Sequence, residues 1–274
     1  MTPSSRLRYR FNIMVKKQRC LLAFVLICTA ACPESHTSSV THIADLISSR
    51  AIDEVDALIH KDYIDPLGDR EQLLRDLKNI YRSFDSVKMK FSQIKILQEA
   101  SFPNSKMIDA HLDTQLIGEH KWAVRGPVFL EVVHQPTHQI RSGLLSNVRD
   151  IITLMDMRVD AIESNSEIAY AQTLHPKYRN GDENRIEAQA RIRQALKGKL
   201  RLRPDRYTVD LTQTQAHVTE WAFISRNQVH QLEPSSITTA NQKLTNKDDT
   251  IKKSEFTLRK SAGQWLIHSI HGEF

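Results

Sequence analysis

Glycine, proline and cysteine are scarce in this sequence, and their scarcity excludes several classes of protein. Eight Gly and nine Pro in 274 residues are too few for a collagen-like or low-complexity chain. The sequence also lacks the motifs of a glycine-rich phosphate loop, a serine nucleophile elbow and a zinc protease. The hydrophobic content of 40% is sufficient for packed cores and argues against a disordered chain.

Acidic side chains are absent from residues 1–31, which hold six basic ones. The whole chain has 38 Lys and Arg against 32 Asp and Glu, so the rest carries 32 of each sign. The body of the protein is therefore formally neutral, which removes the compositional argument for nucleic-acid binding. We expect no nucleic-acid partner.

The first 31 residues have the three regions of a secretory signal peptide. A basic stretch (16–19) precedes an apolar run (21–27), and small residues (29–31) lead to Cys32. The apolar core of about 10 residues is shorter than the roughly 20 that a membrane-spanning helix needs. Small residues before a Cys resemble a bacterial lipobox, in which the Cys is lipidated and becomes the mature N-terminus. Standard secretory cleavage after Ala31 is the alternative.

This interpretation predicts a protein of the bacterial cell envelope, attached to a membrane through lipid on Cys32. Residues 1–31 would be the signal peptide and residues 32–40 a short tether. Translation from Met14 would give a more conventional leader. Cys20 and Cys28 would leave with that leader, so the mature chain would form no internal disulfide.

An internal repeat is the most informative feature of the remaining sequence. Residues 58–63 (LIHKDY) recur as residues 173–178 (TLHPKY), an offset of 115 that retains the His and the Tyr. Arg70 and Arg185 have the same offset. The sequence therefore predicts two tandem copies of one domain.

The two domains are predicted over residues 41–143 and 144–274. In each, apolar residues first follow a 3.6-residue period and then a period of two. The helical patterns cover residues 43–58, 70–83, 148–162 and 183–197, and Ser164 with Glu167 forms a capping box for a further helix. The strand patterns cover residues 87–96, 108–117, 120–133, 200–211, 215–225, 254–260 and 264–271. Helices followed by antiparallel strands indicate an α+β fold.

This element order, with a His-x-x-Tyr segment after the second helix, resembles the nuclear transport factor 2-like superfamily. That superfamily includes ketosteroid isomerase, scytalone dehydratase and polyketide-cyclase-like proteins. The stretch 263–267 (GQWLI) is similar to its frequent closing strand. The resemblance implies two cone-shaped domains, each with three helices on a strongly curved, mainly antiparallel sheet. Members are enzymes, ligand binders or interaction modules, so the fold does not fix the function.

Two His residues on predicted strands are candidates for acid–base chemistry. His111 and Asp113 are two residues apart, which places them on one face of a strand. On a concave face, the carboxylate would orient the imidazole as a general acid/base pair. His217 occupies the matching position of the second copy, with Thr219 in place of the carboxylate. A solvated outer face is the alternative for both strands.

A tentative pocket for a small apolar ligand would include these residues: Tyr63, His111, Trp122, Tyr178, His217 and Trp221. The two tyrosines are expected to pack on the sheet with their hydroxyls near a pocket rim. His60 and His175 are interpreted as structural residues that cap helix carbonyls, with catalysis as the alternative.

We expect no metal site and no cofactor. His268 and His271 are three apart on a predicted strand and so face opposite sides, while Pro136 opposes a helix that would join His134 to His138. The polar segment 231–253 is interpreted as a hairpin insertion, with partner binding as the alternative.

The function predicted from sequence is a lipid-anchored envelope protein that binds a ligand or an envelope protein without catalysis. The alternative is a small-molecule isomerase or dehydratase that uses His111 and Asp113. We also expect the two copies to pack sheet to sheet as an intramolecular pseudo-dimer.

Overall fold

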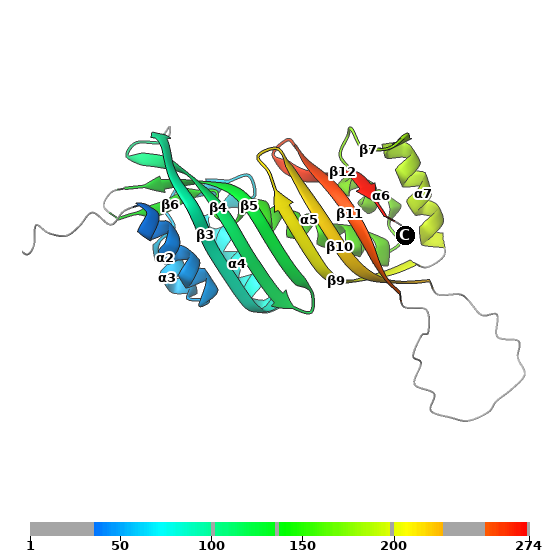
Figure 1. The fold of residues 1–274 in the computed structure, drawn as a ribbon, viewed down its shortest axis with the longest axis horizontal. Helices are drawn as coiled ribbons and strands as arrows, with labels where there is room; N and C mark the ends of the chain where they lie inside the picture. The colour runs from blue at the N-terminus through cyan, green and yellow to red at the C-terminus, as the bar shows by residue number, and fades with distance from the viewer. Residues whose placement is uncertain (1–35, 100–101, 135–136, 198–199, 227–249, 273–274) are drawn as a thin grey trace, which may run out of the picture.

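The computed structural model describes residues 36–99, 102–134, 137–197, 200–226 and 250–272. Cys32, the predicted signal peptide and most of the predicted insertion 231–253 lie outside these residues. Within them the chain is α+β, with six helices and a large mixed sheet (Figure 1), which confirms the predicted class. No helix in this part of the chain is long and apolar enough to cross a membrane.

The first half of the chain begins with helices and continues with long strands. Its helices are α2 (His36–Ser48), α3 (Ile52–Ala57) and α4 (Arg70–Ser83), and a small hairpin of β1 (Ile64–Asp65) and β2 (Gly68–Asp69) precedes α4. Its long strands are β3 (Phe84–Glu99), β4 (Ser105–Gly118) and β5 (Lys121–Val133), followed by the short β6 (Gln139–Ser142).

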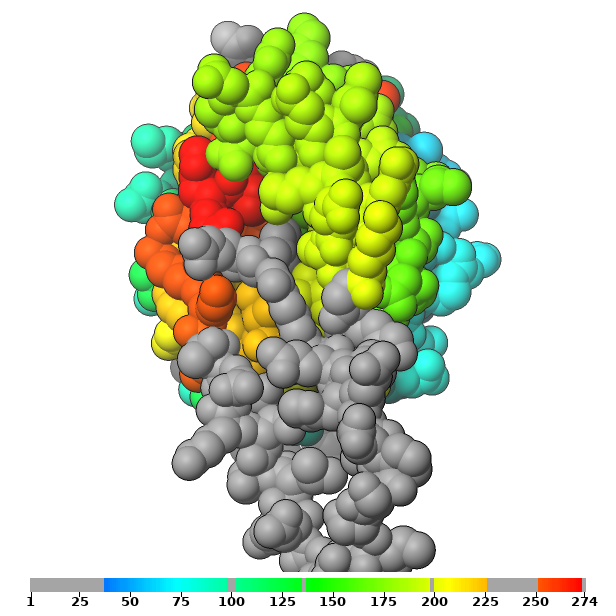
Figure 2. All heavy atoms as spheres, turned by 90° about the vertical axis from the view of Figure 1, so that its right-hand side faces the viewer, coloured from blue at the N-terminus to red at the C-terminus, as the bar shows by residue number. Residues whose placement is uncertain are grey.

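The second half repeats this order of elements. Its helices are α5 (Ser146–Glu163), α6 (Glu167–Thr173) and α7 (Arg185–Lys197), with a small hairpin of β7 (Arg179–Asn180) and β8 (Glu183–Asn184) before α7. Its strands are β9 (Leu200–Leu211), β10 (Gln215–Arg226), β11 (Thr250–Ser261) and β12 (Gln264–His271). Figure 2 shows α7 at this end of the molecule, beside β12.

Three helix boundaries differ from the predictions. Helix α2 begins at His36, within the segment predicted as a tether. Arg50 has a φ of 62°, a left-handed conformation that an α-helix cannot continue, so the predicted first helix is two helices. The N-cap of α6 is Ser166, whose side chain accepts a hydrogen bond from the Ala169 N–H, and not Ser164.

The long strands of both halves belong to one sheet, in the order β12-β11-β10-β9-β5-β4-β3. Neighbours along this order are antiparallel except β5 and β9, where residues 121–125 run parallel to residues 206–210. The halves therefore meet edge to edge, whereas the sequence analysis expected two sheet faces to pack together.

The length of β6 explains why β9 can join β5. Strand β6 pairs only with residues 131–133 of β5, which leaves the edge of β5 at residues 121–125 for β9. In the second half, the longer β12 covers residues 255–261 of β11. An exposed sheet edge presents unpaired backbone groups, and here the second half of the chain satisfies them.

The repeated His makes the same contacts in both halves. The backbone N–H of His60 donates to the Ile140 carbonyl at 2.9 Å, and that of His175 donates to the Ile267 carbonyl at 2.8 Å. The Nδ1 atom of each His accepts a hydrogen bond from the backbone N–H two residues later, at 3.1 and 3.0 Å. Both His side chains thus hold a turn by accepting from N–H groups, rather than by capping carbonyls.

The repeated Arg also has matching partners. Arg185 donates from Nη2 to the Ala171 carbonyl at 2.8 Å, and Arg70 donates to the Asp56 carbonyl at 3.4 Å. Asp56 and Ala171 are themselves 115 residues apart, so each arginine ties the start of a long helix to the short helix before it.

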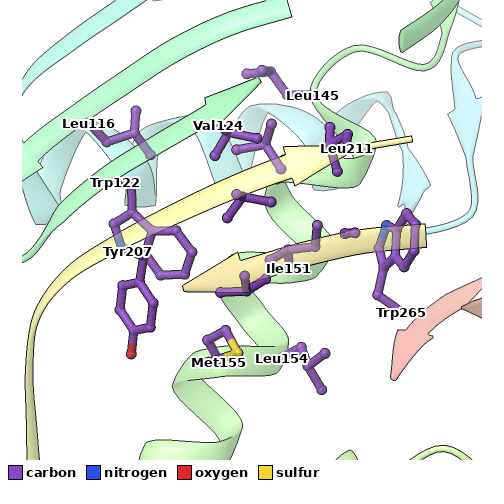
Figure 3. Packing of buried hydrophobic residues seen from close by; sticks show 14 of the residues in the cluster. Leu116, Trp122, Val124, Leu145, Ile151, Leu154, Met155, Tyr207, Leu211 and Trp265 are labelled. Carbon is purple, nitrogen blue, oxygen red and sulfur yellow. The ribbon is translucent and has the colours of Figure 1, made fainter. Parts of the chain in front are cut away.

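Buried apolar side chains form one cluster that runs through both halves. At the β5–β9 junction, Trp122 stacks on Tyr207 with ring centroids 4.0 Å apart (Figure 3). Ile151 and Met155 of α5 lie beneath the junction strands in the same view. Helix α5 therefore anchors the seam between the halves by burying its apolar face against both.

Candidate functional site

A cavity of about 580 Å³ lies between the two halves, on the helical side of the sheet. This volume is within the range of small-molecule sites. Its walls come from α4 and the start of β3, from the β4–β5 turn and β5, and from α5. The lining residues are Asp76, Asn79, Ile80, Arg82, Ser83, Phe84, Glu119, His120, Trp122, Arg149, Ile152, Thr153 and Asp156.

Arg149 of α5 forms one wall of this cavity and is held by two carboxylates of the first half. Its Nε donates to Asp76 Oδ2 at 2.8 Å, and its Nη1 donates to Asp65 Oδ2 at 2.8 Å. The Arg149 side chain is only 2% exposed, so these hydrogen bonds replace the hydration that the guanidinium loses on burial. The arginine thereby fixes the first helix of the second half against the first half.

Tyr63 extends this network away from the cavity. Its hydroxyl donates to Asp65 Oδ2 at 2.6 Å, and burial together with the charge of Asp65 raises the pKa of Tyr63 well above its usual value. The tyrosine stays neutral and acts as a donor that orients Asp65 towards Arg149. Tyr63 is thus a buried support of the site and does not line it.

Asp156 lies two turns beyond Arg149 on α5, and it lines the cavity together with His120 of the β4–β5 turn. Burial and the nearby charge of Asp160 raise the pKa of Asp156 to about 6. Asp156 is exposed at the cavity, but the packed atoms around its carboxyl disfavour the ionised form. Within the described part of the chain, the buried Nδ1 of His120 has no hydrogen-bond partner.

The cavity lining combines apolar side chains with an excess of acidic groups. Trp122, Phe84 and Ile152 supply apolar surface. Arg149 is already neutralised by its two carboxylates, so Arg82 is the remaining cation of the lining, against Glu119 and Asp156. Such a site can bind a small molecule with an apolar body, a positive charge and a hydrogen-bonding group for His120.

Of the six residues predicted to form a pocket, Trp122 lines the cavity. Tyr178 is buried in the second half, where its hydroxyl donates to Glu183 Oε2 at 3.2 Å. His217 is exposed and Trp221 is partly exposed on the outer face of the sheet. These last three residues do not line the cavity.

His111 and Asp113 also lie on the outer face of the sheet. Both are partly exposed, and they alternate with the buried residues Leu112 and Thr114 of β4. Asp113 forms an ion pair with Arg125 of β5, with a distance of 3.6 Å between Oδ2 and Nε. The two residues are therefore on one face, as predicted, but this face is the solvated one.

A second buried polar cluster lies inside the second half. Arg158 of α5 donates from Nη1 to Glu220 Oε1 of β10 at 2.9 Å, and the two side chains are 0% and 1% exposed. The guanidinium lies 4.6 Å from the centroid of the Phe256 ring. Burial raises the pKa of the neighbouring Tyr170 and Tyr207, which remain neutral. This cluster occupies the core and does not line the cavity.

The sequence analysis missed the residues that make the cavity polar. Arg149, Thr153 and Asp156 recur at a helical spacing on a helix otherwise interpreted from its apolar face. That polar stripe was a signal of the site in the sequence. However, the partners of Arg149, which are Asp65 and Asp76, lie more than 70 residues away from it in sequence. Among the described residues, no group of three or more His, Cys, Asp or Glu could hold a metal ion.

No protein-family profile matches the chain, and no curated protein matches it. Solved structures are similar to slightly less than half of it. A proposed ketosteroid isomerase from Shewanella frigidimarina is 17% identical over 45% of this chain and 94% of its own, with a TM-score of 0.32.

Two further solved structures have similar coverage. A proposed dehydratase of the NTF2-like family from Streptomyces avermitilis is 12% identical over 46% of this chain and 95% of its own, with a TM-score of 0.37. An NTF2-like protein of unknown function from Pseudomonas putida is 10% identical over 45% of this chain and 83% of its own, with a TM-score of 0.35.

Proposed function

We propose that this protein binds a small, positively charged molecule, without catalysis, in the cavity between its two halves. The observation that carries this proposal is the cavity of about 580 Å³, with apolar Trp122 and Phe84 on its walls and Asp156 and His120 among its polar groups. Acidic lining groups outnumber basic ones, and this imbalance favours a cationic ligand.

Phenethylamine and 3-phenylpropionate provide a matched test, because both carry a phenyl ring and differ in the sign of their charge. We expect the amine to raise the melting temperature of the protein and the carboxylate to leave it unchanged. Asp156→Asn should weaken amine binding about tenfold or more, because it removes a charge-assisted contact. Glu163→Gln is the control on the same helix, because Glu163 is exposed and does not line the cavity. Equal stabilisation by both probes would contradict the proposed ligand class.

We further propose that the chain consists of two tandem nuclear transport factor 2-like domains, over residues 41–143 and 144–274. The repeated order of elements and the matched contacts of the His and Arg pairs support this division. The β5–β9 junction would then be the contact that makes the two copies an intramolecular pseudo-dimer.

The proposed location is the bacterial cell envelope, with lipid on Cys32 as the membrane anchor. The apolar run 21–27 and the small residues before Cys32 support it. Mass spectrometry of the N-terminal peptide from the native host should find a lipidated Cys32 and no residue before it. An unmodified Cys32, or residues 1–31 still attached, would refute the anchor. Cys32→Ser should release the protein from membranes.

A second candidate function is acid–base catalysis of an isomerase or dehydratase type in the same cavity. The pKa of Asp156, raised to about 6, favours it because perturbed carboxyls beside a His are typical of active sites. His111 and Asp113 lie outside the cavity, so this alternative depends on Asp156 and His120 instead. A turnover that His120→Ala lowers by about 10²–10⁴-fold would establish it.

A further inference from the structure

The outer face of the sheet is continuous across the junction of the two halves. Lys121 of β5 lies beside Arg206 of β9, which lies beside Trp221 of β10, which lies beside Lys253 of β11. In the next row, Arg203 lies beside Phe223. In Figure 1, β9, β10 and β11 lie in front of α5, with no described helix over them.

This end of the outer face is basic although the body of the protein is formally neutral. The side chains of Arg201, Arg203 and Arg206 are exposed. In the part of the chain that the structure describes, these three arginines form no ion pair. Glu255 lies one row away, and its carboxylate binds Lys253 at 2.5 Å. These three arginines therefore present positive charge on this face without an ion pair to a described carboxylate.

Aromatic and aliphatic side chains accompany these charges. The guanidinium of Arg206 lies 4.1 Å from the Trp221 ring centroid, and that of Arg203 lies 4.9 Å from the Phe223 ring centroid. Ile251, opposite Phe223 on β11, is 54% exposed. Exposed apolar groups ringed by basic ones match the boundary between lipid headgroups and acyl chains.

We propose that this basic–aromatic patch, formed by Arg201, Arg203, Arg206, Trp221, Phe223 and Ile251, binds an anionic membrane surface. The arginines would contact lipid phosphates, while Trp221 and Ile251 would enter the headgroup region. The patch is on the opposite side of the sheet from the cavity, so this inference does not depend on the proposed ligand.

The covered ring faces favour a membrane over a single-stranded nucleic acid. A nucleic-acid platform needs free aromatic faces on which bases stack. Here a guanidinium already occupies one face of both Trp221 and Phe223, and the exposed Ile251 beside them offers aliphatic surface on which bases do not stack.

Quenching of tryptophan fluorescence can test the patch directly. The chain has three Trp residues, and Trp122 and Trp265 are 3% and 2% exposed, so Trp221 is the accessible one. The full-length protein would be mixed with vesicles of phosphatidylglycerol and phosphatidylcholine that carry a nitroxide on the headgroup. We expect quenching of Trp221 on these vesicles and little on pure phosphatidylcholine, with the difference reduced by salt.

The triple variant Arg201→Gln, Arg203→Gln and Arg206→Gln should lower partitioning onto the anionic vesicles about 100-fold, at about fivefold for each basic side chain. The control variant Lys78→Gln, Arg179→Gln and Lys197→Gln removes the same charge from exposed positions on α4, β7 and α7. It should retain most of the binding.

Three results would overturn the proposal. The first is an equal loss of binding in the two triple variants. The second is no quenching of Trp221 by the nitroxide lipid. The third is binding of a single-stranded oligonucleotide through the same arginines without vesicle binding. Because phenethylamine binding is measured separately, failure of the patch is distinguishable from failure of the proposed cavity function.

Discussion

At the residue scale, the ionic groups of α5 separate into supports and ligand contacts. Arg149 and Arg158 are both buried and paired with carboxylates from other elements, so their charges hold the fold together. Asp156, between them in sequence, lines the cavity and forms no ion pair among the described residues. One helix thus carries both the structural ion pairs and the group available to a ligand.

Arg149→Met should destabilise the protein strongly, because it leaves Asp65 and Asp76 without their cation. Removing one partner of a buried ion pair typically costs about 3–5 kcal/mol. The control is Arg193→Met, which breaks an exposed pair with Glu167 and should have little effect. Urea denaturation measures both, and similar losses in the two variants would contradict the supporting role of Arg149.

Asp156→Asn should stabilise the protein, and the effect should depend on pH. The pKa of Asp156 rises from 3.8 to about 6 in the folded state, so ionisation opposes folding at neutral pH. The gain should be complete above about pH 7, decrease between about pH 6 and pH 4, and vanish below that, where the carboxyl is neutral in both states. Urea denaturation at several pH values tests this, and a gain that persists at pH 3 would contradict it.

The same residue offers a check on the ligand. A cationic ligand needs ionised Asp156, so its affinity should fall as the pH drops through about 6. Stability and ligand affinity thus respond to the same carboxyl in opposite directions.

At the element scale, the sequence predicted most strands and the long helices, because their patterns are local. Residues 215–225 and 264–271 alternate in polarity and form β10 and β12. The parallel pairing of β5 with β9 could not be predicted in this way. It depends on how much of the β5 edge the four residues of β6 leave uncovered, and this follows from three-dimensional packing.

Gly126 of β5 tests the importance of this junction. A Cβ at this position would lie 2.4 Å from the Leu211 carbonyl oxygen of β9, and its φ of 137° is one that other residues rarely adopt. Gly126→Ala should therefore destabilise the protein by more than 2 kcal/mol, from strain and a forced separation of β5 and β9.

Gly181→Ala is the control for this substitution. It also has a positive φ, of 60°, but no atom lies within 4 Å of an added Cβ. It should cost about 1 kcal/mol. Thermal unfolding measures the stability of both variants. Equal losses of stability would contradict the close packing of the junction.

At the scale of the whole molecule, the cavity exists because two halves meet. Helix α4 and the β4–β5 turn come from the first half, while α5 comes from the second. Sequence analysis drew a tentative pocket from residues of both copies and did not place it at their junction. The contacts that build the cavity join residues such as Asp76 and Arg149, which no local pattern connects.

This arrangement also explains why His111, Asp113 and His217 looked like candidates. Their strands alternate in polarity, which defines two faces but does not say which face is covered. The helices cover the face of Leu112 and Val218, so the His residues lie on the other. Which face is buried depends on the side of the sheet against which the helices pack, and the alternation of polarity does not encode this.

The most direct test of the account is a crystal structure of the protein soaked with phenethylamine. We expect the amine between α4, the β4–β5 turn and α5, with its ammonium group within hydrogen-bond distance of Asp156 and its ring against Trp122 or Phe84. An empty cavity in a crystal that holds the amine elsewhere, or halves that do not share the β5–β9 junction, would contradict it.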